Sequence, residues 1–109
     1  MTFNEYQKLS KRTAKYGPIG HRVIYPTLGL TGEAGEVAEK IKKVMRDEGG
    51  IFTEAHRTEL SKELGDVLWY IAQIASELEL NMEEIARANL DKLMSRLERD
   101  KLAGNGDNR

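Results

Sequence analysis

The chain has 109 residues, a length that fits one domain whose core is small enough to gain from a partner subunit. Its 17 basic residues nearly balance its 18 acidic residues, and the net charge of −1 argues against a protein that coats a polyanion. The absence of cysteine excludes disulfides and thiolate metal sites. No apolar run reaches membrane length, so we expect a cytoplasmic protein that binds neither nucleic acid nor a membrane.

Two helices are predicted in the N-terminal half. The first covers about residues 4–16, where Tyr6 and Leu9 share a loosely apolar face, and "GPIGH" then ends it with glycine and proline. The second covers about residues 26–48, because Pro26 suits a first helical turn and two glycines follow residue 48. Its apolar side chains recur at helical spacing: Leu30, Ala34, Val37, Ala38, Ile41, Val44 and Met45.

Two more helices are predicted in the C-terminal half. The third covers about residues 54–79, with Thr53 as its N-cap. Asn81, with Glu84 three residues later, indicates a capping box for the fourth, at about residues 82–102. No segment alternates with period two, so the predicted fold class is all-α. We expect one bundle-like domain of four helices at residues 1–103, built on a central antiparallel hairpin, and a disordered tail at 104–109.

The second and third helices carry one motif twice, at an offset of 30 residues. "GLTGEAGEV" at residues 29–37 matches "LSKELGDV" at residues 60–67. The chemically matched pairs are Glu33 with Glu63, Gly35 with Gly65, and Glu36 with Asp66. A glycine inside a helix costs about 1 kcal/mol relative to alanine, so its repetition indicates positions where side-chain bulk is unwelcome.

The four acids of the two motifs are expected to converge. In each helix the second acid lies one turn beyond the first, on the same flank of the apolar stripe. Because the linker is short, the helices form an antiparallel hairpin whose equivalent flanks open on one side at about one level. Converging carboxylates repel one another and need a cation, and magnesium or manganese is the ion that carboxylates prefer. We predict a metal site whose ligands are Glu33, Glu36, Glu63 and Asp66.

The alternative is that the four acids are solvated and make ordinary salt bridges with Lys40, Lys43 or Lys62. A di-iron bundle site fits less well, because it uses Glu-x-x-His on facing helices. Neither His21 nor His56 lies three residues after a glutamate. Both histidines are expected on the surface or in loops.

At these residues the chain resembles the MazG-like all-α nucleotide pyrophosphohydrolases. The family signature is Glu-x-x-Glu on one helix and Glu-x-x-Asp on the next, here "EAGE" and "ELGD", and the resemblance extends over about residues 28–96. It implies the MazG-type fold and magnesium-dependent hydrolysis of a nucleoside triphosphate between its α and β phosphates, which gives a nucleoside monophosphate and pyrophosphate. It also implies a homodimer or a dimer-based tetramer.

The residues agree with that chemistry. No serine, cysteine or histidine is arranged as a covalent nucleophile, which favours direct attack by an activated water. The predicted catalytic residues are therefore the same four: Glu33, Glu36, Glu63 and Asp66. One of them could orient the water instead of binding the metal, and the sequence does not say which.

Three polar residues of the fourth helix fall at the flank positions that the acids take on the other two. They are Asn89, Lys92 and Arg96, and "ANLDKLMSR" also resembles the family's Asn-x-x-Lys segment, which implies contact with substrate. Basic side chains beside a metal site would bind phosphate oxygens that the metal does not reach. The alternative is a solvated helix face that pairs with Asp91 or Glu98.

Two aromatic residues follow the second motif. Tyr70 shares the flank of the acids, one turn beyond Asp66, and is predicted to contact the base or ribose. Trp69 points away and is expected to pack against another helix or subunit. The glycine-rich residues 17–29 either close over the substrate or only connect two helices.

The leading prediction is thus a homo-oligomeric, magnesium-dependent nucleotide pyrophosphohydrolase. A non-catalytic helical module that binds metal or a partner is the competing class. A third reading keeps the chemistry and changes the substrate, for instance to phosphoribosyl-ATP or an alarmone.

Overall fold

Four helices make up the part of the chain that the structure describes. This computed structural model describes residues 1–99, which hold α1 (Phe3–Lys11), α2 (Ile24–Asp47), α3 (Glu54–Glu77) and α4 (Met82–Glu98), and no strand. The all-α prediction is confirmed. The predicted tail at residues 104–109 and the end of the predicted fourth helix lie outside the described residues. Within residues 1–99, no helix has the length and apolar character that a membrane span requires.

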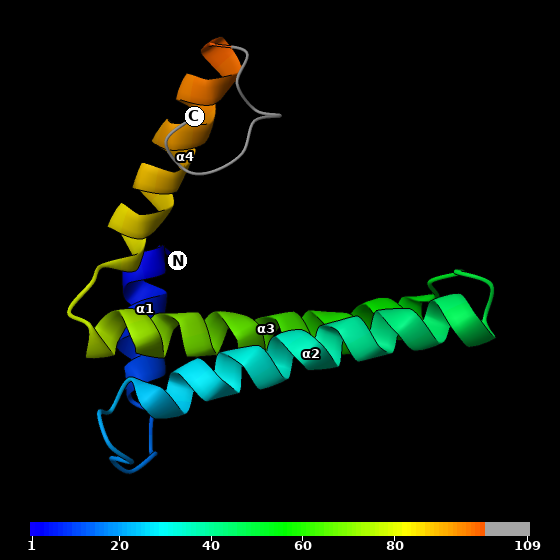
Figure 1. Cartoon of the computed structure of the whole chain (residues 1–109), viewed down its shortest axis with the longest axis horizontal. Helices are drawn as coiled ribbons and strands as arrows, with labels where there is room; N and C mark the ends of the chain where they lie inside the picture. The colour runs from blue at the N-terminus through cyan, green and yellow to red at the C-terminus, as the bar shows by residue number, and fades with distance from the viewer. Residues whose placement is uncertain (100–109) are drawn as a thin grey trace.

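The central element is a long antiparallel hairpin of α2 and α3 (Figure 1). Thr53 caps α3 as predicted: its hydroxyl accepts a hydrogen bond from the His56 amide at 3.3 Å, and its own amide donates to His56 Nδ1 at 3.0 Å. The chain reverses at Gly49 and Gly50, whose φ angles of 61° and 75° suit glycine. This turn sets which α2 and α3 side chains face each other.

α1 is shorter than predicted. It ends at Lys11, so the extension to residue 16 is wrong. The amides of the next three residues bond to carbonyls three positions back, which tightens the last turn and ends the helix. Tyr16 instead turns towards α3, where its hydroxyl donates a hydrogen bond to Glu77.

α1 crosses the hairpin near the end of α3 and is fastened there by two glutamines. The Gln7 amide donates to Ser76 Oγ at 3.1 Å, and its oxygen accepts from the Met82 amide at 2.9 Å. Gln73, fully buried on α3, donates to Ser10 Oγ at 2.9 Å. The small buried core at this crossing consists of Ala72, Ala75 and Met82, with Tyr6 and Leu68 packed against it.

α4 leaves the hairpin. It packs against α1 and projects away from α2 and α3 (Figure 1). Its apolar side is therefore poorly covered, with Leu90 60% and Met94 52% exposed. The hairpin exposes apolar side chains too, and Leu64 of α3 is 55% exposed. A single chain thus leaves apolar faces on both α4 and the hairpin.

The repeated glycines do not fill crowded positions in this chain. Beyond its own helix backbone, a Cβ built at Gly35 or Gly65 would meet no described atom within 4 Å. The expectation that bulk is unwelcome there is therefore not explained by packing within residues 1–99. Gly29 is the helix position where a close approach does occur, and it belongs to the site below.

Candidate functional site

Three of the four predicted acids meet between α2 and α3. Glu33 on α2, with Glu63 and Asp66 on α3, place one carboxylate oxygen each within 4.8 Å of one another. Glu33 and Glu63 are half-buried and Asp66 is exposed, so the group lies at the edge of the helix interface. The repeat produces this arrangement because matched positions on two antiparallel helices face each other. We call these three residues the acidic group.

Glu36 lies outside the acidic group. It is exposed on α2, one turn beyond Glu33. Its negative charge is near enough to contribute to the raised pKa of Glu33. The structure therefore brings three of the predicted ligands together and leaves the fourth beside them.

The acidic group carries more negative charge than its surroundings balance. A hydrogen bond with Glu63 raises the pKa of Glu33, and burial together with the charges of Asp66, Glu63 and Glu36 raises it further. Oxygens on opposite sides of a magnesium ion lie about 4.2 Å apart. Oxygens already within 4.8 Å of one another need only a small movement to reach that geometry. The oxygen donor set and its excess charge thus fit a hard divalent cation such as Mg²⁺ or Mn²⁺.

The raised pKa of Glu33 predicts a pH dependence for the metal-free protein. The folded state holds this proton more tightly than the unfolded chain does, so the free energy of unfolding falls as pH rises from the ordinary value of 4.5 through the raised pKa. Glu33→Gln removes this part of the fall and should raise the midpoint of thermal unfolding at neutral pH by a few degrees. Melting curves in a chelator across mildly acidic and neutral pH measure it. Parallel pH profiles for the two proteins would contradict it.

Tyr70 stands beside the acidic group, one turn beyond Asp66 on α3. Burial and the neighbouring Tyr25 raise the pKa of its hydroxyl, and the charges of Glu33 and Asp66 add to the effect. Its ring lies against the backbone of α2 at Gly29, where a Cβ would fall 2.2 Å from Tyr70 Cε1. Glycine at residue 29 is therefore required for this ring position.

Tyr70 also lines an open cavity of about 260 Å³. Aromatic rings form most of its wall: Tyr16 and Tyr25 stack with centroids 5.1 Å apart, and Trp69 meets Tyr70 edge-to-face at 5.1 Å. Trp69 packs within its own chain, and its Nε1 donates to Thr13 Oγ1 at 2.8 Å. The residues that line this aromatic cavity are Thr13, Lys15, Tyr16, Tyr25, Trp69 and Tyr70.

The segment between α1 and α2 forms part of the wall of this cavity and is held onto α3 by Glu77. The Glu77 carboxylate accepts hydrogen bonds from the Tyr16 hydroxyl and, at 3.3 Å, from Arg22 Nε. The Arg22 guanidinium lies 5.1 Å from the centroid of the Tyr16 ring. Burial and the bond to Glu77 raise the pKa of Tyr16 to about 12, so this donor stays protonated. Tyr16 and Tyr25 were not predicted as site residues. The segment around them has no helical periodicity, and its one signal is the presence of tyrosines near a glycine-rich loop.

The predicted substrate residues of α4 are not at the acidic group of their own chain. Asn89 is exposed, Lys92 is half-buried and Arg96 is buried. All three lie on α4, which projects away from the hairpin (Figure 1). Of the predicted substrate residues, only Tyr70 lies beside the acids within one chain.

Comparisons with known proteins give two findings. Residues 26–99, which contain most of α2 and all of α3 and α4, match the family model of the MazG nucleotide pyrophosphohydrolase domain. The chain is also similar to a Mycobacterium phage L5 protein named "Gene 37 protein". The two are 44% identical over an alignment of 109 residues, which covers 95% of this chain and 96% of the phage protein. No solved structure matches the chain.

Proposed function

The chain belongs to the MazG nucleotide pyrophosphohydrolase domain family, and we propose that it hydrolyses a nucleoside triphosphate between its α and β phosphates. The products are a nucleoside monophosphate and pyrophosphate. One observation carries the proposal: the family's two acidic motifs, on α2 and α3, place three carboxylate oxygens within 4.8 Å of one another. In this proposal Mg²⁺ is the resident ion and Mn²⁺ can replace it.

The acids have two tasks in this reaction. Glu33, Glu63 and Asp66 hold the cation, which when bound neutralises negative charge on the phosphate oxygens. Glu36 is exposed on the same flank and lies outside the acidic group, so it is the carboxylate best placed to accept a proton from the attacking water. No covalent enzyme intermediate is needed.

The aromatic cavity is the proposed binding site of the nucleotide base. Stacking on aromatic side chains holds any base by its face, which suits a wall of tyrosine and tryptophan. Tyr70 lies between this cavity and the acids. Its ring lines the cavity, and the charges of Glu33 and Asp66 contribute to the raised pKa of its hydroxyl. A nucleotide would then lie with its base at Tyr70 and its phosphates at the acidic group.

A second copy of the chain is the proposed partner. Exposed apolar side chains on α4 and on the hairpin, such as Leu90 and Leu64, are the surfaces that an oligomer would bury. Since α4 projects from its own hairpin, it is able to reach the hairpin of another copy. Asn89 and Lys92 would then serve the acidic group of the partner and not their own, whereas Arg96 is buried within its own chain.

Leu90→Glu tests the oligomer. Leu90 is 60% exposed on α4, so in an isolated chain the change should cost less than about 0.5 kcal/mol. In the proposed oligomer it buries a charge and should weaken self-association at least tenfold. Analytical ultracentrifugation over a concentration series measures this, with Ala88→Glu, on the other side of α4, as the matched control. Unchanged mass for Leu90→Glu at every concentration would contradict this interface.

The proposed function is tested by a screen for pyrophosphate release. Common ribo- and deoxynucleoside triphosphates, an alarmone and phosphoribosyl-ATP are each incubated with the protein, in Mg²⁺ and in a chelator. Mg²⁺-dependent release from at least one triphosphate is the expected result. Release from phosphoribosyl-ATP or the alarmone alone would keep the chemistry and change the substrate, and no release from any compound would favour a non-catalytic helical module.

A further inference from the structure

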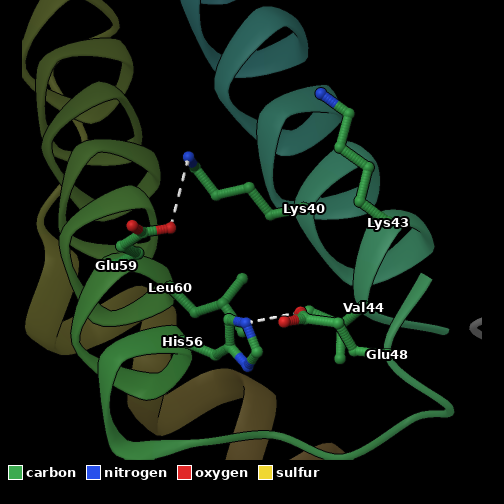
Figure 2. Close-up of a pocket in the computed structure, with 7 residues that line it drawn as sticks. All are labelled: Lys40, Lys43, Val44, Glu48, His56, Glu59 and Leu60. Carbon is green, nitrogen blue, oxygen red and sulfur yellow. Dashed lines mark ion pairs between the residues drawn. The ribbon is translucent and has the colours of Figure 1, made fainter.

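Lys40 is the cation that lies against the acidic group. It extends from α2 towards α3, where its Nζ is 3.8 Å from Glu59 Oε2 (Figure 2). The same Nζ is also 3.8 Å from Glu63 Oε1. Glu63 belongs to the acidic group, whereas Glu59, one helical turn earlier on α3, does not. A single ammonium group is therefore shared between one predicted metal ligand and one carboxylate beside it.

The two carboxylates offer Lys40 two positions. Glu63 is 20% exposed and is already engaged by Glu33, while Glu59 is 62% exposed. Lys40 and Glu59 line a cavity of about 200 Å³, whose wall also contains the pair of His56 Nε2 and Glu48 Oε2 at 2.7 Å (Figure 2). Because the ammonium group already lies 3.8 Å from both carboxylates, it can leave Glu63 and stay paired with Glu59.

A cation at 3.8 Å from Glu63 competes with a divalent ion for that carboxylate. Like charges that share one ligand repel, so the metal must displace Lys40 or bind beside it at a cost in affinity. Without any cation, on the other hand, the three carboxylates would face one another uncompensated.

From this geometry we propose that Lys40 is a tethered cation: it bridges Glu63 and Glu59 in the metal-free protein and pairs with Glu59 alone when metal binds. The inference rests on the metal site of the proposed function. Its consequence is that free metal binds weakly, and that the negative phosphates of a nucleotide are needed to bring the ion in. Lys40 is a positioning residue in this scheme, since it acts through Glu63.

The test is Mn²⁺ binding without nucleotide, measured from the electron paramagnetic resonance signal of free Mn²⁺ at one fixed neutral pH. Lys40→Met should bind Mn²⁺ about tenfold more tightly than the wild type. Glu59→Gln removes the second position, holds Lys40 on Glu63, and should bind several-fold more weakly. Lys40→Arg should stay near the wild type, because it keeps the charge.

Lys43→Met is the matched control. Lys43 lies on the same helix and pairs with Glu39 of that helix at 3.7 Å, so its removal should leave Mn²⁺ affinity unchanged. In a chelator, Lys40→Met should also melt at a lower temperature than Lys43→Met, and Mn²⁺ should abolish the difference.

Equal or weaker Mn²⁺ binding by Lys40→Met relative to Lys43→Met overturns the inference, as does no Mn²⁺ binding by either. Should Lys40→Met fail to fold, a Glu59→Gln affinity equal to that of the wild type overturns it. Failure of the proposed function is a separate result, namely no nucleotide turnover by a wild type that binds Mn²⁺.

Discussion

Glu63→Gln is expected to lower kcat for nucleoside triphosphate hydrolysis by about 10²–10³-fold. The substitution removes one negative charge from the acidic group, in which Glu63 has a carboxylate oxygen within 4.8 Å of those of Glu33 and Asp66. The amide keeps the size of the side chain and can still hydrogen-bond Glu33, so the fold should persist. Initial rates of pyrophosphate release at saturating substrate and Mg²⁺ measure the effect.

The matched control for this prediction is Glu39→Gln. Glu39 lies on α2 as an acid outside the acidic group, and its carboxylate pairs with Lys42 at 2.9 Å and Lys43 at 3.7 Å. Its loss should change kcat less than about twofold, since exposed ion pairs contribute little. A Glu63→Gln enzyme that turns over as fast as Glu39→Gln would show that the acidic group is not the catalytic site.

Tyr70→Ala is expected to raise KM for the nucleotide by about 10- to 100-fold, because stacking of one base on an aromatic ring contributes about 1–3 kcal/mol. Tyr70→Phe keeps the ring and should stay within a few-fold of the wild type. Steady-state kinetics of the three proteins with one nucleoside triphosphate measure this. Equal KM values for the wild type and Tyr70→Ala would place the base elsewhere.

Gly29→Ala tests the same ring from the other helix. A Cβ at residue 29 would lie 2.2 Å from Tyr70 Cε1, so the ring must leave its position and KM should rise as it does for Tyr70→Ala. Gly32→Ala, on the same helix, is the control, since a Cβ there would meet no atom within 4 Å beyond the backbone of its own helix. A normal KM for Gly29→Ala would mean that the ring position is not needed for nucleotide binding.

The hairpin and the acidic group are the parts that the sequence predicted best. Local signals define them: Thr53 caps α3, two glycines form the turn, and the repeat places Glu33 opposite Glu63. Once a short turn fixes the register of two antiparallel helices, matched positions must face each other. Glu36 was expected at the same level and instead lies outside the group. Its counterpart Asp66, which is also one turn beyond the first acid of its motif, lies inside the group, so the repeat alone does not distinguish the two positions.

The aromatic cavity and the direction of α4 were not predictable in the same way. The cavity depends on Tyr16, in the loop between α1 and α2, and on Tyr25, at the start of α2, where periodicity gives no information. Asn81 indicated the start of α4, but the sequence does not say against which element the helix packs. Within residues 1–99, α4 packs against α1, and Leu90 stays 60% exposed.

The most direct test of the central claim is a ³¹P nuclear magnetic resonance spectrum of the reaction with one nucleoside triphosphate that the enzyme accepts. In Mg²⁺, the wild type should give nucleoside monophosphate and pyrophosphate in equal amounts, and neither should form in a chelator. Nucleoside diphosphate with orthophosphate would contradict cleavage between the α and β phosphates. Product formation that continues in the chelator would contradict a metal held by Glu33, Glu63 and Asp66.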